Sequence, residues 1–167
     1  MSELHISILD VVLRLLAAVV LSGIIGFNRE MHRKPAGVRT HMLVSLGSAA
    51  FVIVALELAH GPIAEILGGD AKPDPTRVLE GIVHAIGFLG AGAIIQARGS
   101  VVGLTTGVSV WIAGGIGVAC GGGFYALAAL LAAMAFVILA AIGALEACFG
   151  SDSVDGGKPS KGSRRNS

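Results

Sequence analysis

Carboxylate and imidazole side chains occur at helical spacing in one apolar part of this sequence. Glu80 and His84 lie four residues apart, and Glu57 on a preceding segment can lie at a similar depth. Residues four apart share one face of a helix, and such a pair inside a membrane can relay protons or bind a divalent cation. Imidazole is a poor ligand for Mg²⁺, which prefers oxygen ligands and keeps much of its water. Glu80 and His84 are therefore candidates for proton or cation chemistry, and interfacial packing between helices is the alternative interpretation.

A second charged pair has the same spacing near the beginning of the chain. Asp10 and Arg14 share a helix face, and Arg14 lies within an apolar segment. An unpaired charge there is costly, so the spacing predicts an ion pair. Its role is either structural, near the outer surface, or a polar entry into the helix bundle.

The third candidate is the cationic segment 28–41, which contains four of the twelve Lys and Arg residues. Pro35, just ahead of Gly37 and Val38, predicts the start of a helix, with Arg39 and Thr40 in its first turn. The free N–H groups at a helix N-terminus can bind an anion. We expect lipid phosphate as this anion, with a soluble phosphate compound or an acidic partner protein as the alternative.

The sequence lacks enzyme signatures. Gly90-Ala91-Gly92 begins like a dinucleotide fingerprint, but Ile95 stands where the third glycine belongs. Nucleophile-elbow, P-loop and zinc-protease motifs are absent, and the spacing of His60, Asp70 and Asp74 is too irregular for a convincing metal site. We predict that the chain is not an enzyme, has no catalytic residue and no cofactor, and does not bind nucleic acid.

The elements that hold these residues are apolar segments near the length of about 20 residues that a helix needs to cross a bilayer. Apolar residues make up 54% of the chain and charged residues 14%, and the mean hydropathy is +0.82. We predict an all-α polytopic membrane protein, a bundle of about five transmembrane helices in one domain over residues 1–150, with a disordered cytoplasmic tail over 151–167. The predicted spans are Ile8–Phe27, Val38–Ala59, Val78–Ala97, Val101–Ala119 and Phe124–Phe149.

Two features of these spans have consequences for packing. Glycines in the third and fourth spans, with Gly103-xxx-Gly107 and Gly117-xxx-Gly121 among them, predict close helix packing, although a broken helix lining an ion path uses similar residues. The same glycines weaken the intrinsic helicity of the fourth span. Cys120 is expected at the outer end of the fourth span and Cys148 at the inner end of the fifth span, some 40 Å apart, so they cannot pair.

The distribution of Lys and Arg predicts the orientation. The segment 28–41, Arg98 and the tail together carry nine, whereas the connection 61–77 carries two. By the positive-inside rule, the N-terminus lies outside and the C-terminus in the cytoplasm. The first ten residues lack a basic region, so we expect the first helix to be retained rather than cleaved.

Three blocks of this sequence together resemble the N-terminal transmembrane domain of the MgtC/SapB family. The first block runs from Arg14 through Gly23-Ile24-Ile25-Gly26-Phe27-Asn28-Arg29-Glu30 to Lys34-Pro35-Ala36-Gly37-Val38-Arg39-Thr40-His41. The second block runs from Asp74-Pro75-Thr76-Arg77 to Gly87-Phe88-Leu89-Gly90-Ala91-Gly92. The third block covers Val102-Gly103-Leu104-Thr105-Thr106 with Trp111. The family usually has Glu-Arg where this chain has Asn28-Arg29, and Glu80 and His84 are not part of its pattern. The functional candidates are Asp10, Arg14, Arg29, Glu30, Lys34, Pro35, Gly37, Arg39, Thr40, Asp74, Arg77, Gly87, Gly90, Gly92, Thr105 and Thr106.

The resemblance implies a multi-pass protein of the bacterial inner membrane that supports growth at low Mg²⁺ and, in pathogens, survival inside host cells. Family members look like modulators of membrane energetics and of partner membrane proteins, including the ATP synthase. Transport of Mg²⁺, another cation or protons is the alternative. The expected partners are the lipid bilayer and other membrane proteins, and self-association into a homo-oligomer is left open.

Overall fold

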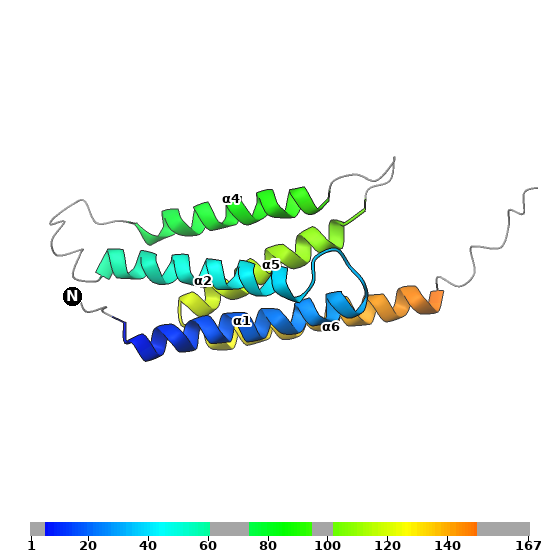
Figure 1. The fold of residues 1–167 in the computed structure, drawn as a ribbon, viewed down its shortest axis with the longest axis horizontal. Helices are drawn as coiled ribbons and strands as arrows, with labels where there is room; N and C mark the ends of the chain where they lie inside the picture. The colour runs from blue at the N-terminus through cyan, green and yellow to red at the C-terminus, as the bar shows by residue number, and fades with distance from the viewer. Residues whose placement is uncertain (1–5, 61–73, 95–101, 150–167) are drawn as a thin grey trace, which may run out of the picture.

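The computed structural model describes residues 6–60, 74–94 and 102–149, with side chains described up to residue 141. These residues form the helices α1 (Ile8–Met31), α2 (Val38–His60), α4 (Pro75–Ala93), α5 (Leu104–Gly121) and α6 (Tyr125–Phe149), and no strand occurs among them (Figure 1). The predicted all-α class is therefore confirmed. The predicted tail, most of the connection 61–77, Arg98 and the Cys148 side chain lie outside the described residues.

Helix α5 is the centre of the bundle, because it packs against all four other helices. Helix α4 packs on α5 and α2, and α6 packs on α5 and α1, so α4 and α6 lie on opposite sides of the molecule (Figure 1). The glycines of α5 do not interrupt it, contrary to what their weak helix propensity suggests. Burial of most of the helix among its neighbours outweighs the cost of about 1 kcal/mol for each glycine.

Glycines of α5 face backbone of neighbouring helices, as predicted. A Cβ atom added to Gly117 would clash with the Ser45 carbonyl on α2, and one added to Gly107 would lie 2.7 Å from the Gly90 carbonyl on α4. By contrast, a Cβ at Gly87 or Gly92 would meet nothing within 4 Å. The prediction of close helix packing is thus confirmed for the face of α4 that carries Gly90. The glycines on the other face of α4 contact no neighbouring helix among the described residues.

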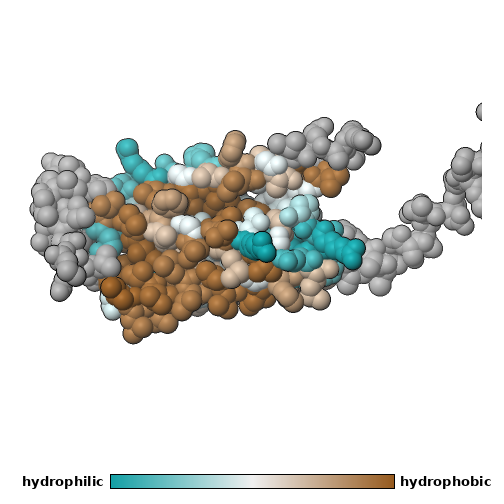
Figure 2. Space-filling view, in the orientation of Figure 1, coloured by the Kyte–Doolittle hydropathy of each residue, from teal (hydrophilic) through white to brown (hydrophobic). Residues whose placement is uncertain are grey.

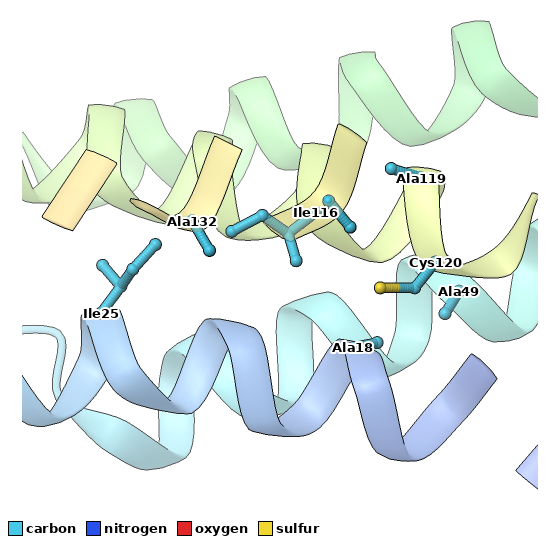
Figure 3. Close-up of a cluster of buried hydrophobic side chains, with 8 residues drawn as sticks. Ala18, Ile25, Ala49, Ile116, Ala119, Cys120 and Ala132 are labelled. Atoms are coloured by element: carbon cyan, nitrogen blue, oxygen red, sulfur yellow. The ribbon is translucent and has the colours of Figure 1, made fainter. Parts of the chain in front are cut away.

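The core at the meeting point of α1, α2, α5 and α6 combines several alanines with two isoleucines and a cysteine (Figure 3). Ala18, Ile25, Ile116 and Cys120 are fully buried there, and Cys120 is free. A second cluster, which includes Val52, Ile82, Ile86 and Val110, joins α4 to α2 and α5. Alanine and glycine at these contacts allow the close helix approach on which association in lipid depends.

Large apolar side chains also cover much of the outside of the bundle. Ile8, Phe27, Phe51 and Phe88 are each more than half exposed, and apolar surface dominates over α1 in Figure 2. Such a surface is not compatible with water as the only solvent. Among the described helices, α1, α2 and α5 are long and apolar enough to cross a membrane, and α6 is apolar through Ala141. Helix α4, which corresponds to the third predicted span, does not reach the same combination of length and apolar composition. The chain is a polytopic membrane protein, as predicted.

Two helix boundaries differ from the prediction in ways that move candidate residues. Helix α1 continues four residues past Phe27, to Met31, so Arg29 belongs to a helix and not to the cationic loop. Helix α4 begins at Pro75 because the Asp74 carboxylate accepts a hydrogen bond of 2.9 Å from the Thr76 N–H, which is an N-cap contact.

Candidate functional site

Arg29 is the most deeply buried charged side chain among the described residues. It lies in the last turn of α1, is only 4% exposed, and donates through Nη2 to the Thr106 Oγ1 at 2.6 Å, in the first turn of α5. Its Nε atom is buried without a partner in the described part of the chain. The prediction placed Arg29 in the cationic segment after the first span. Instead, α1 extends past Phe27 and turns this side chain into the bundle.

His41 joins α2 to the same place. Its Nδ1 lies 2.9 Å from the Gly37 carbonyl and its Nε2 lies 3.2 Å from the Ser109 Oγ, while the Ser109 Oγ also lies 2.9 Å from the Thr106 carbonyl. With the His41 proton on Nδ1, Nε2 is an acceptor, and the single Ser109 O–H then donates either to this Nε2 or to the Thr106 carbonyl, but not to both at once. Arg29, His41, Thr106 and Ser109 therefore form one polar cluster across α1, α2 and α5, which we call the buried polar cluster.

The buried polar cluster is sealed as well as polar. None of its four side chains is more than 4% exposed, so the His41–Ser109 contact is closed to a substrate. A fixed guanidinium inside low-dielectric surroundings repels cations strongly. The arrangement is suited to holding three helix ends together and to placing a positive charge inside the bundle.

The side chain of Glu30, next to Arg29, is exposed instead of buried and caps the N-terminus of α2. Its Oε2 accepts from the Val38 N–H at 2.9 Å, and Gly37 allows this approach because a Cβ there would lie 2.6 Å from the same oxygen. The first N–H of α2 is therefore occupied by a carboxylate of the same chain. One of the N–H groups predicted to bind an anion is thus occupied by Glu30, which also places a negative charge at this helix N-terminus. Anion binding by the remaining N–H groups stays a prediction.

The remaining cationic side chains of this region are on the surface. Arg33, Lys34, Arg39 and Thr40 are exposed, as is Pro35. They form the polar end of the molecule at the α1–α2 connection in Figure 2. Their position fits contact with lipid headgroups.

At the other end of the bundle, the predicted ion pair between Asp10 and Arg14 is confirmed. Arg14 Nη2 lies 2.7 Å from Asp10 Oδ2. Arg14 also donates to the Gly121 carbonyl at 2.8 Å, and the Tyr125 hydroxyl lies 3.4 Å from Asp10 Oδ1. The pair thus satisfies a carbonyl that the last turn of α5 leaves without a helical partner and connects α1 to the α5–α6 turn.

Glu80 and His84 share a face of α4 as predicted, but the imidazole contacts the Glu80 backbone and not its carboxylate. His84 Nδ1 lies 2.7 Å from the Glu80 carbonyl oxygen, and both side chains are exposed. Glu57 is engaged elsewhere, where it accepts from the Ile6 N–H at 2.8 Å. Within residues 6–60, 74–94 and 102–149, no group of three His, Cys, Asp or Glu side chains is arranged to hold a metal ion.

Other family-motif residues occupy structural positions. Asp74 caps α4, and Arg77 is exposed one turn later. Gly90 contacts α5, whereas Gly87 and Gly92 face outward. Thr105 is exposed and its neighbour Thr106 is buried, so only the second threonine of this pair belongs to the buried polar cluster.

Sequence reasoning did not select His41 or Ser109 as site residues. The spacing of Thr106 and Ser109 places them on one face of a helix, and this was the available local signal. No local signal joins that face to Arg29, which is 77 residues away in the chain.

Comparison with known proteins gives consistent family matches. The MgtC family model matches residues 15–148. The chain is 37% identical over 131 residues to "Putative magnesium transporter YhiD" of Escherichia coli (strain K12), covering 78% of this chain and 59% of that protein. It is 39% identical over 131 residues to "Protein MgtC" of Brucella abortus (strain 2308), covering 78% and 49%.

A third relative is "Protein MgtC" of Salmonella typhimurium (strain 14028s / SGSC 2262), which is 39% identical over 123 residues, covering 72% of this chain and 48% of that protein. The chain spans about half the length of the curated relatives it matches. No solved structure matches it.

Proposed function

Because the chain belongs to the MgtC family, we propose that it is a protein of the bacterial inner membrane that supports growth when Mg²⁺ is scarce. We propose further that it acts as a modulator of membrane energetics or of partner membrane proteins, the ATP synthase among them, and that in a pathogen this activity supports survival inside host cells. The family match over residues 15–148 carries the first part of the proposal.

The buried polar cluster supports a modulator over a cation carrier. Arg29 places a permanent positive charge between α1, α2 and α5, and Thr106 holds it in position. A Mg²⁺ ion moving along this interface would meet strong electrostatic repulsion in low-dielectric surroundings. The alanines of the core allow close packing of α1, α2, α5 and α6, and the outer faces of the bundle are available to neighbouring membrane proteins.

Growth of a bacterial strain that lacks its own MgtC tests the physiological role. Wild-type chain should restore growth in low-Mg²⁺ medium, and Arg29→Gln should not, because it removes the charge from the buried polar cluster. Arg33→Gln, at an exposed position four residues away, is the matched control and should restore growth. Membrane levels of each variant are compared by immunoblot. Failure of the wild-type chain to restore growth contradicts the proposal.

Transport remains the second candidate because one relative is named a putative magnesium transporter. Purified chain in liposomes loaded with a Mg²⁺-sensitive or pH-sensitive dye separates the two candidates. We expect tight vesicles. Flux of Mg²⁺ or protons that falls on Glu80→Gln would favour transport and contradict the modulator.

We also propose that the chain has no enzymatic activity. The closed environment of His41 and Ser109 supports this, because neither side chain is accessible to a substrate. Labelling of Ser109 by a fluorophosphonate probe in native membranes would contradict it.

A further inference from the structure

The outer face of α4 carries the polar side chains that are hardest to reconcile with lipid. Arg77, Glu80 and His84 are all exposed, and at about 100° per residue they fall within roughly 60° of one another around the helix. Ile82 and Ile86, which pack into the core, lie on the opposite side. The polar stripe formed by Arg77, Glu80 and His84 therefore points directly away from the bundle. Figure 2 shows polar surface at the outer edge of α4 near its N-terminal end, with apolar surface beyond it.

The depth of this polar stripe makes lipid a poor neighbour. His84 is nine residues from Pro75, roughly 13 Å along the helix axis. If α4 enters the bilayer at Pro75, this distance carries His84 past a headgroup layer of about 5–8 Å. Among the described residues, Glu80 has no ion-pair partner. Ionisable side chains at such positions usually face protein or water rather than acyl chains.

The charge pattern of the polar stripe is complementary to itself. Arg77 is positive and Glu80 is negative, one helical turn apart, and His84 follows one turn further. When two copies of α4 pack in parallel about a twofold axis along the membrane normal, Glu80 of one copy lies between Arg77 and His84 of the other. Because of the twofold axis, the Glu80–Arg77 and Glu80–His84 contacts each occur twice in the dimer.

The same face also permits close approach of two helices. Gly81 and Gly87 flank the polar stripe, and a Cβ atom at either would meet nothing within 4 Å. Small residues at an exposed helix face let a second backbone come near enough for interhelical hydrogen bonds to form. The open glycines and the complementary charges thus occupy one surface.

We propose that the chain forms a symmetric dimer in the membrane through the outer face of α4, with Glu80 of each copy bound to Arg77 and His84 of the other. This proposal stands independently of the proposed function. It accounts for the position of three polar side chains that make no ion pair within the described bundle.

Disulfide cross-linking of the full chain in bacterial membranes tests the interface. The background is Cys148→Ser, with Cys120 kept because it is fully buried. After oxidation, His84→Cys and Gly87→Cys should give dimers. Leu16→Cys, at a position 54% exposed on α1, should stay monomeric. Absence of dimers from both α4 positions, an equal dimer yield from Leu16→Cys, or adducts with a different protein only would each overturn the proposal.

A charge exchange tests the chemistry separately from the geometry. In the Gly87→Cys chain, Glu80→Arg leaves only positive charge in the polar stripe and should lower the dimer fraction by roughly tenfold. Adding Arg77→Glu to Glu80→Arg restores opposite charges and should recover the dimer. An unchanged dimer fraction on Glu80→Arg, or no recovery in the double variant at matched membrane levels, would overturn the proposal.

Discussion

Arg29 illustrates how far the role of a single side chain depends on a boundary of a few residues. With α1 ending at Phe27 it would be a surface charge, and with α1 ending at Met31 it is a buried partner of Thr106. The spacing of Asp10 and Arg14 predicted their ion pair because both residues lie on one helix. The Arg29–Thr106 contact could not be predicted in this way, since it depends on how α5 crosses α1.

Thr106→Val tests the contribution of the buried polar cluster to stability. The substitution keeps the side-chain shape and removes the oxygen that accepts from Arg29. We expect a loss of about 1–2 kcal/mol, because a buried guanidinium loses an acceptor. Thermal unfolding in detergent measures it. The matched control is Thr105→Val, at the exposed neighbouring position, and an equal effect of the two substitutions would show that the hydrogen bond is unimportant.

At the scale of the helix, the N-terminus of α4 depends on the ionised state of Asp74. Hydrogen bonds from the Thr76 side chain and backbone hold the pKa of the Asp74 carboxyl below its usual range. A lowered pKa in the folded state means that the stabilising effect is present above the pKa of the unfolded chain and is lost as the pH falls through the folded pKa.

Titration of Asp74, followed by NMR of its carboxyl carbon in detergent, should therefore give a midpoint below that of an aspartate in an unfolded peptide. In Thr76→Val the side-chain donor is gone, and the midpoint should move up toward the peptide value. A Thr76→Val midpoint equal to that of wild type would contradict the capping role of the hydroxyl.

The glycines of α5 provide a paired test of helix packing. Gly117 faces the Ser45 carbonyl on α2, and a Cβ there would also lie 2.8 Å from the Ser48 Cβ. Gly117→Ala should destabilise the bundle by about 1–3 kcal/mol through overpacking. Gly115→Ala, where a Cβ would meet nothing within 4 Å, should be neutral or stabilising by up to about 1 kcal/mol, because alanine favours the helix. Equal unfolding temperatures for the two variants would contradict the packing.

Sequence patterns predicted the existence of the five helices better than their contacts. Apolar length was sufficient for α1, α2 and α6, and glycine spacing correctly indicated that α5 packs closely. The same reasoning placed the start of α4 at Val78 instead of Pro75, because hydropathy does not register an Asp74 cap. It also could not determine which face of α4 turns outward, since that depends on the positions of α2 and α5.

For the whole molecule, the unequal distribution of Lys and Arg still predicts that the α1–α2 connection lies in the cytoplasm. Burial of Arg29 lowers the count on that side from nine to eight, against two on the other. The α1–α2 connection and the start of α4 lie at opposite ends of the bundle (Figure 1). A label that cannot cross the membrane should therefore distinguish them.

In a Cys148→Ser background, Lys34→Cys should react with a membrane-impermeant maleimide only after cells are opened, and Thr76→Cys should react in intact cells. Both positions are exposed. The reverse pattern would invert the orientation and place the cationic connection outside. Reaction of both positions in intact cells would indicate a leaky preparation, and a periplasmic marker protein is therefore assayed in parallel.

Burial of Arg29 against α5 has a consequence for biogenesis. The ribosome completes α1 and α2 before it synthesises Thr106, so the newly inserted hairpin leaves the translocon without the acceptor for that guanidinium. Until α5 arrives, the side chain is expected to reach the headgroups. Chains truncated before residue 102 should therefore be substrates for membrane quality-control proteases.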